Sequence, residues 1–426
     1  MSSTLAPLRA PAFRWLLAGR TINLLGSAAA PIALAFAVLD LTGSTTDLGI
    51  VVAARSISNV LLLLYGGVLA DRLPRRLLLV TSASAAAATQ AAVAALVLSG
   101  GAQVWSLALL SAVNGAVSGV GMPAALSVLP QTVPGEHLTS ANALSRLISN
   151  GTNLLGLSLG GALVALVGPG WGIAVDAAAF AAAAFCFARL PSVQLTPERR
   201  SVLADLQAGW AEFISRTWVW VVVTQFLIVN AALAAAEGVL GPVVADRTIG
   251  RSGYGVVLAA SAAGLLLGSG VALRYRPRRA LRFGVLVCLG LALPALTLAV
   301  SPTLIALVVA FFLAGVTTDL FSVAWDVSLQ QNVPPERLAR VYSYDALGSL
   351  LAIPIGQIAV GPISSSVGTD TTLLILACAV IVATLLALTS ASLRTLERLP
   401  EQAAPNQQPQ PTQADGAGHP PFGDAV

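Results

Sequence analysis

Charged residues are scarce in this sequence. Only 10% of the 426 residues are charged and 56% are hydrophobic, whereas about a quarter of the residues in an ordinary soluble domain are charged. The mean hydropathy of +0.82 agrees with that balance. These values exclude an ordinary soluble domain and predict a membrane protein. Lysine is missing altogether, so all 23 basic residues are arginines.

Cysteine and histidine are also rare. The three cysteines, at 186, 288 and 378, lie inside apolar runs with neither a CxxC spacing nor a nearby histidine, which argues against a metal site or a disulfide. The two histidines, His137 and His419, lie outside the long apolar segments, and no GxxxxGK[ST] phosphate loop is present. We therefore expect no cofactor and no metal, and the sequence argues against a membrane enzyme or an ATP-driven pump.

Long apolar segments fill most of the chain. A helix needs about 20 apolar residues to cross the hydrocarbon of a bilayer, and twelve segments qualify: 13–39, 47–70, 77–99, 103–128, 140–165, 171–189, 218–243, 253–273, 280–300, 303–328, 341–366 and 371–394. We predict an all-α polytopic membrane protein with twelve transmembrane helices. Residues 190–217 are polar and predict an amphipathic helix on a membrane surface. The segment 399–426 has the composition of a disordered tail.

Arginine placement predicts the orientation. If both termini are cytoplasmic, 18 arginines lie on the cytoplasmic side and only Arg247 and Arg251 lie outside, while Arg20, Arg55 and Arg146 fall within or at the edges of spans. This asymmetry follows the positive-inside rule. It predicts a multi-pass protein of the cell membrane, in contact with lipid, and it explains the positive charge without any nucleic-acid partner.

The two halves of the chain repeat each other. Residues from Leu129, LPQTVPGEHLTSANAL, match those from Leu329, LQQNVPPERLARVYSY, at an offset of 200, and glycines such as Gly115 and Gly315 keep the same register. We predict two six-helix halves, 1–189 and 218–398, joined by a linker at 190–217 and followed by a tail at 399–426. Halves related in this way enclose a central cavity.

Residues 67–76, GVLADRLPRR, carry an unusual concentration of charge. They resemble the signature G-x-L-A-D-R-x-G-R-R that major facilitator transporters have between their second and third helices, with Pro74 in place of glycine. The resemblance implies a major facilitator fold and a conformational latch between the halves. Its residues would be Gly67, Asp71, Arg72, Arg75 and Arg76, with Arg337, Arg340 and Asp345 as partners. The alternative is that the arginines only retain the loop in the cytoplasm.

Further stretches narrow the resemblance. LPQTVPGEHLTSANAL, WGIAVDAAAF and AWDVSLQQNVPPERLARVYSYDALGS are similar to drug:proton antiporters of the branch that includes macrolide-efflux proteins and the enterobactin exporter. The resemblance implies export of a small organic molecule against inward proton flow. We also expect the protein to be a monomer. The chain departs from these antiporters in two places: the fourth span lacks an arginine, and Gly156-Leu157 replaces a Gly-Pro pair.

Acidic residues inside spans are candidates for proton coupling, because an unpaired charge is costly there. Glu237 and Asp319 are the proton-coupling candidates, and the alternative for each is a structural hydrogen bond. Asp326 and Asp345, near the cytoplasmic ends, fit a gate. Asp176 lies near the start of its span, where a carboxylate suits the positive end of the helix dipole, so a capping role is favoured.

Other polar residues inside spans are candidates for the cavity wall. The candidates are Arg20, Arg55, Asn114 and Asn230, since a binding cavity is mostly apolar with a few polar points. Arg20 and Arg55 have the alternative of reaching an interface with their long side chains, and Arg55 has the further alternative of pairing with Asp40 or Asp47.

The direction of transport stays open between two readings. The resemblance favours a proton-coupled exporter, while the same fold also serves proton-coupled importers of small nutrients. A sensor or scaffold without transport is a third reading, against which the intact latch sequence argues.

Overall fold

The computed structural model describes residues 3–134, 137–191, 214–275, 277–333 and 335–397, and some side chains inside these ranges are left undescribed. Secondary structure in these ranges is helical, without strands. Twelve described helices or helix series are long and apolar enough to cross a membrane. The predicted all-α fold with twelve spans is thereby confirmed. The predicted tail, and most of the predicted linker (192–213), lie outside the described residues.

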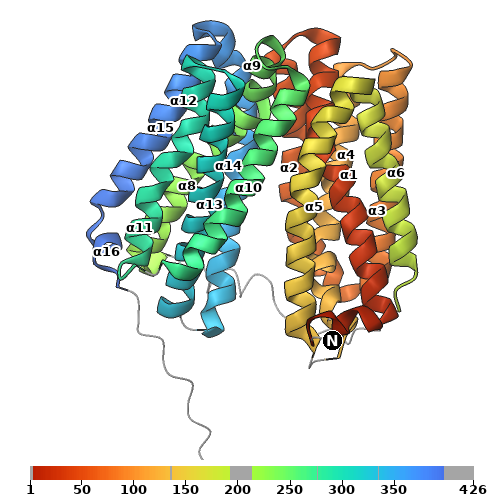
Figure 1. Cartoon of the computed structure of the whole chain (residues 1–426), viewed down its shortest axis with the longest axis horizontal. Helices are drawn as coiled ribbons and strands as arrows, with labels where there is room; N and C mark the ends of the chain where they lie inside the picture. The colour runs from red at the N-terminus through yellow and green to blue at the C-terminus, as the bar shows by residue number, and fades with distance from the viewer. Residues whose placement is uncertain (1–2, 135–136, 192–213, 276, 334, 398–426) are drawn as a thin grey trace, which may run out of the picture.

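The first six spans form one group of helices (Figure 1). After the short helix η1 (Ser3–Arg9), the group consists of α1 (Pro11–Thr42), α2 (Thr45–Arg72), α3 (Arg75–Leu98), α4 (Val104–Val128), α5 (Leu138–Val167) and α6 (Pro169–Ala188), with η2 (Leu129–Gln131) after α4. Gly43, with φ of 64°, ends α1 in the left-handed region, where glycine carries no Cβ penalty.

The remaining spans form a second group and contain more interruptions. They are α8 (Thr217–Ala235), η4 (Ala236–Leu240), α9 (Gly241–Arg247), α10 (Gly250–Arg274), α11 (Ala280–Val287), η5 (Cys288–Ala292), α12 (Leu293–Val300), α13 (Leu304–Asn332), α14 (Pro335–Val367), α15 (Thr369–Thr389) and α16 (Ala391–Thr395). Helix α8, the π-helix η4 and α9 together make one span, as do α11, η5 and α12.

Glycines bring corresponding helices together in both groups. A Cβ placed on Gly115 of α4 would lie 2.1 Å from the carbonyl oxygen of Arg55 in α2, and a Cβ on Gly315 of α13 would lie 2.0 Å from that of Ser261 in α10. Lipid supplies little hydrophobic drive between helices, so close backbone approach at small residues is a main source of their packing. The glycine match at an offset of 200 therefore corresponds to one helix contact made twice.

The two groups meet at one end. A Cβ on Gly161 of α5 would lie 2.5 Å from Cα of Gly255 in α10, and one on Gly49 of α2 would lie 2.4 Å from the carbonyl oxygen of Gln357 in α14. In Figure 1, α5 and α10 converge at this end and separate toward the end where the chain begins. We call the end where α5 and α10 converge the closed end. The other, which carries Arg14, Arg75, Arg76 and Arg189, is the basic end.

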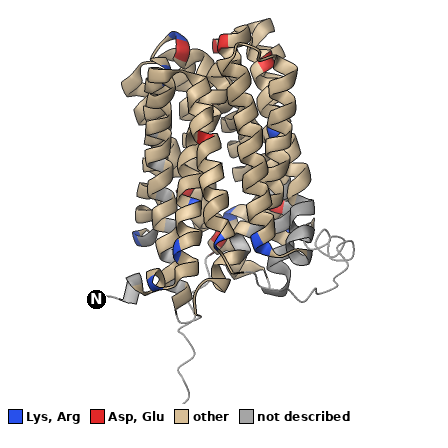
Figure 2. Cartoon of the chain, turned by 90° about the vertical axis from the view of Figure 1, so that its right-hand side faces the viewer, with Lys and Arg blue, Asp and Glu red and all other residues tan. Residues whose placement is uncertain are grey.

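Most charged residues lie near one of the two ends of the helices, and few lie near the middle of the helices (Figure 2). The exceptions are therefore easy to identify, and each requires a physical explanation, because water is scarce at that depth.

We predict that Gly161→Leu opens the closed end. Leucine at 161 would overlap the α10 backbone, and overpacking of this kind costs about 1–3 kcal/mol. Electron resonance distances between spin labels at Leu166 and Ser252 should lengthen or broaden. The control is Gly151→Leu on the same helix, where an added Cβ meets nothing within 4 Å. Unchanged distances in a well-folded Gly161→Leu protein would contradict the close approach.

Candidate functional site

A cavity of about 360 Å³ lies between the two groups of helices. Its wall comes from α1, α8, η4, α9, α10 and α14, and most of the lining residues are apolar, such as Ile32, Leu258 and Ile353. Glu237, Asn230 and Tyr254 are the polar members. This size and composition suit a small organic molecule. The cavity lies next to the closed end, because Tyr254 directly precedes the Gly255 contact with α5.

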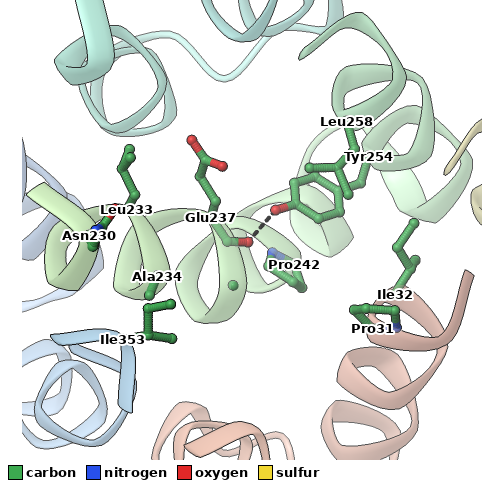
Figure 3. Close-up of a pocket in the computed structure, with 11 residues that line it drawn as sticks. Pro31, Ile32, Asn230, Leu233, Ala234, Glu237, Pro242, Tyr254, Leu258 and Ile353 are labelled. Atoms are coloured by element: carbon green, nitrogen blue, oxygen red, sulfur yellow. Dashed lines mark hydrogen bonds between the residues drawn. The ribbon is translucent and has the colours of Figure 1, made fainter. Parts of the chain in front are cut away.

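The wall at Glu237 is an irregular turn of helix. Residues Ala236–Leu240 form the π-helix η4, and Pro242, at the start of α9, has no N–H to donate to the regular helical ladder. The hydroxyl of Tyr254, which is only 2% exposed, donates a hydrogen bond to the backbone carbonyl of Glu237 (Figure 3). Such π-turns occur frequently at functional sites.

The side chain of Glu237 lies inside a membrane span without a partner. Its carboxylate makes neither a hydrogen bond nor an ion pair with any side chain in the described ranges. In Figure 3 it points away from Ile353 and Pro31, to the opposite side of η4. An unpaired ionised carboxylate is costly at this depth. A proton or a cationic ligand would relieve that cost.

Of the predicted polar cavity residues, Asn230 is the one in the wall. Its amide donates to the backbone carbonyl of Ser349 in α14 at 3.4 Å. Asn114 lies elsewhere, between α3 and α4. It is 2% exposed, and its amide donates to the hydroxyl of Thr89 at 3.1 Å. The sequence shows that both asparagines are mid-span, but it does not show which face they occupy.

Asp319, the second proton-coupling candidate, is also away from this cavity. It accepts a hydrogen bond of 2.8 Å from the hydroxyl of Ser269, which links α13 to α10. This contact is the structural hydrogen bond that the sequence left as the alternative. Glu237 and Asp319 therefore have different surroundings, and only Glu237 borders the cavity.

The half-buried Arg20 and Arg55 do not line the cavity. Arg55 interacts electrostatically with Asp176, and not with Asp40 as the sequence allowed. Asp40 instead binds Arg251.

Asp176 is placed differently from the sequence prediction. Helix α6 begins at Pro169, so Asp176 lies about two turns inside it and does not cap its start. Its carboxylate is 1% exposed and accepts hydrogen bonds from the amide of Gln90 at 2.5 Å and the hydroxyl of Ser27 at 3.3 Å. The capping interpretation was wrong: the span was predicted to begin at residue 171, two residues late, and Asp176 lies beyond the first turn of the helix.

The side chains of several predicted latch residues lie outside the described residues: Gly67, Asp71, Arg72, Arg337 and Arg340. Arg75 and Arg76 begin α3, and the guanidinium of Arg76 donates to the backbone carbonyl of Ala188 at 2.5 Å, which ties this turn to the end of α6. The latch itself stays a prediction.

Asp345 has a contact of its own in the second group of helices. Its carboxylate accepts a hydrogen bond of 3.0 Å from the indole N–H of Trp325, which joins α14 to α13. Asp345 precedes the membrane span of α14. Burial raises the pKa of its carboxyl, and the Trp325 hydrogen bond opposes that shift.

An ionic contact joins the two groups at the closed end. The guanidinium of Arg251, at the start of α10, binds both carboxylate oxygens of Asp40 at the end of α1. It also binds Asp246 at 3.1 Å, and it lies 4.8 Å from the ring centre of Phe36. The sequence identified Arg251 only as one of two arginines outside the membrane. Its partners were not visible there because they lie 211 and 5 residues away.

The comparisons with known proteins agree with this architecture. The profile of the Major Facilitator Superfamily matches residues 16–356 and 254–422. The chain is 28% identical to the multidrug efflux pump Tap of Mycolicibacterium fortuitum, over 86% of this chain and 92% of that protein. It is 25% identical to the enterobactin exporter EntS of Escherichia coli, over 92% and 95%. In structure it resembles the nucleoside transporter NupG, with a TM-score of 0.72, 14% identity and coverage of 91% and 99%.

The profile covers most of the chain, and the fold and the curated relatives agree with it. The chain is a multi-pass membrane protein that transports small molecules, and it is not an enzyme. The chain belongs to the Major Facilitator Superfamily.

Proposed function

We propose that this protein exports a small, mostly apolar organic molecule, such as a drug or a secondary metabolite, by alternating access and in exchange for protons. The observation that carries the proposal is Glu237, a residue that lines an apolar cavity between the two halves and whose carboxylate has no partner among the described side chains. The efflux functions in the names of Tap and EntS support the outward direction.

The arginines support an orientation. The basic end would face the cytoplasm under the positive-inside rule, and both termini with it. The closed end would then be the external side, and the cavity would be loaded from the cytoplasm. Opening to the outside would require the Arg251–Asp40 bridge and the Gly161–Gly255 contact to separate while the basic end closes. The predicted latch around Asp71 would stabilise that second state.

Coupling to protons would follow from competition at Glu237. When the cavity faces outward, a proton binds the carboxylate and relieves its unpaired charge. When the cavity faces the cytoplasm, a substrate that brings a cationic group to the carboxylate favours release of that proton, and the loaded protein returns outward. Either occupant makes the buried carboxylate tolerable, whereas an empty ionised site would be costly to move through the membrane. Because the protein changes conformation readily only with one of the two occupants bound, substrate leaves the cell in exchange for protons.

Import of a small nutrient is the second candidate function. Likeness in fold to a nucleoside transporter at 14% identity supports the fold alone, so the relatives with efflux functions carry more weight for direction.

We predict that Glu237→Gln abolishes proton-driven export. Accumulation of macrolides, tetracyclines, phenicols, dyes and siderophores would be measured in a pump-deficient bacterium, with and without a protonophore. The intact protein should lower accumulation of at least one compound, and the protonophore should restore it. Glutamine keeps the size but cannot release a proton, so export should fall by about 100-fold or more, the low end of what a positioned proton-transfer group contributes.

The matched control is Asp319→Asn, which changes a hydrogen-bonded carboxylate away from the cavity and should keep most of the activity. Equal loss of export in both variants would contradict a role in proton coupling that is specific to Glu237. Increased uptake of any compound by the intact protein would overturn export in favour of import.

We predict that Arg251→Gln shifts the protein toward the outward-open state. The substitution removes contacts with Asp40, Asp246 and Phe36, and partly exposed ion pairs are worth about 0.2–1 kcal/mol each, so a shift of a few fold is expected. Labelling of Leu258→Cys by a membrane-impermeant maleimide from outside the cell would measure it. Arg247→Gln, an exposed arginine on the preceding turn, serves as control. Slower or equal labelling in Arg251→Gln would count against a gate at this place.

A further inference from the structure

A polar network lies inside the first group of helices, separate from the cavity. Its centre is Asp176 of α6, with Gln90 of α3 and Ser27 of α1 as hydrogen-bond donors. The hydroxyl of Ser27 also lies 3.2 Å from the amide oxygen of Asn23, one turn before it on α1. Side chains from three helices thus converge around a carboxylate that is 1% exposed.

The charge of this carboxylate is incompletely compensated. Arg55 of α2 interacts with it electrostatically, but no direct ion pair joins the two side chains. Among described side chains, no other charged residue of the surrounding helices interacts with Asp176. The other charged residues of those helices are Arg14, Arg20 and Asp40 on α1, Asp47 on α2, and Arg75 and Arg76 on α3, together with Asp71, Arg72 and Arg146, whose side chains are not described.

The network is mechanically connected to the cavity through α1. Pro31 lies one turn after Ser27 and has no N–H, so the carbonyl of Ser27 lacks its usual helical partner. Pro31 and Ile32 line the cavity. Ser27 therefore bonds to Asp176 through its side chain at the place where the backbone ladder of α1 is interrupted, and proline positions of this kind are where helices bend.

We propose that Asp176 is a second proton-binding site, and that its protonation alters the bend of α1 at Pro31 and thereby the cavity wall. A proton on the carboxyl group replaces the charge that Gln90 and Ser27 solvate, and it turns one oxygen from an acceptor into a donor. With the proton on Oδ1, the oxygen that accepts from Ser27, the Ser27 contact must rearrange beside the break in the helix. The inference rests on the proposed function, because it adds a proton site to a proton-coupled transporter.

The test needs no substrate. Full-length protein in lipid bilayers is titrated across about pH 5 to 9, a range that covers the raised pKa values of carboxyl groups buried in proteins. Infrared difference spectra record the carbonyl band of protonated carboxyl groups. A second readout is the rate at which a small maleimide labels Ile32→Cys in a background without native cysteines. In the parent protein this rate should change at least threefold over the titration.

Asp176→Asn should remove one titrating component of the carbonyl band and make the labelling of position 32 independent of pH. Glu237→Gln, as the matched control, should remove a different component. A folded Asp176→Asn protein that keeps the whole band and the pH-dependent labelling would overturn the proposal, and loss of only one of the two signals would overturn it as well.

If Asp176→Asn does not fold, the Ser27→Ala variant tests the proposal in its place. Loss of the hydroxyl removes a donor that favours the ionised carboxylate, so the midpoint of both titrations should move to higher pH. Unmoved midpoints would overturn the proposal. Failure of the export proposal would appear only in the accumulation assay, so the two ideas fail separately.

Discussion

A carboxylate inside a bilayer must find a partner, and much of this structure can be understood from that requirement. At the closed end Asp40 has Arg251, within reach of water. In the first group of helices Asp176 has two neutral donors and a distant arginine. On the cavity wall Glu237 has neither. These three degrees of compensation distinguish a surface bridge, a buried network and an uncompensated carboxylate at the proposed binding position.

Glycine supplies the second constraint. Helices in lipid cannot rely on a hydrophobic drive toward one another, so they associate where backbones come close. Gly115 and Gly315 build corresponding contacts within each group, whereas Gly161 and Gly255 build a contact between the groups. The contacts of Gly115 and Gly315 each hold two helices together within one group. The second pair must separate if the cavity opens at the closed end, so chemically similar contacts have different mechanical roles.

The spans could be predicted from the sequence because length and hydropathy are properties of a single segment, independent of what the segment touches. The face on which a residue lies is a property of the packed bundle. For this reason Asn114 and Asn230 looked alike in sequence, although one bonds to Thr89 inside a helix group and the other borders the cavity. Asp176 was misjudged because the boundary of its span was placed a few residues late. Arg251 and Asp40 could not be paired, since nothing in the sequence relates residues so far apart.

The absence of lysine has an electrical consequence at Arg55. A lysine at this depth could lose its proton, whereas a guanidinium keeps its charge at every physiological pH. With Asp176 ionised, Arg55 and Asp176 together carry no net charge. With Asp176 protonated, the two carry one net positive charge. The membrane potential acts on such a charge with about 2.3 kcal/mol per 100 mV for a full crossing. Under the proposal that Asp176 binds a proton, its electrostatic coupling to Arg55 would make the conformational equilibrium of this half sensitive to voltage as well as to pH.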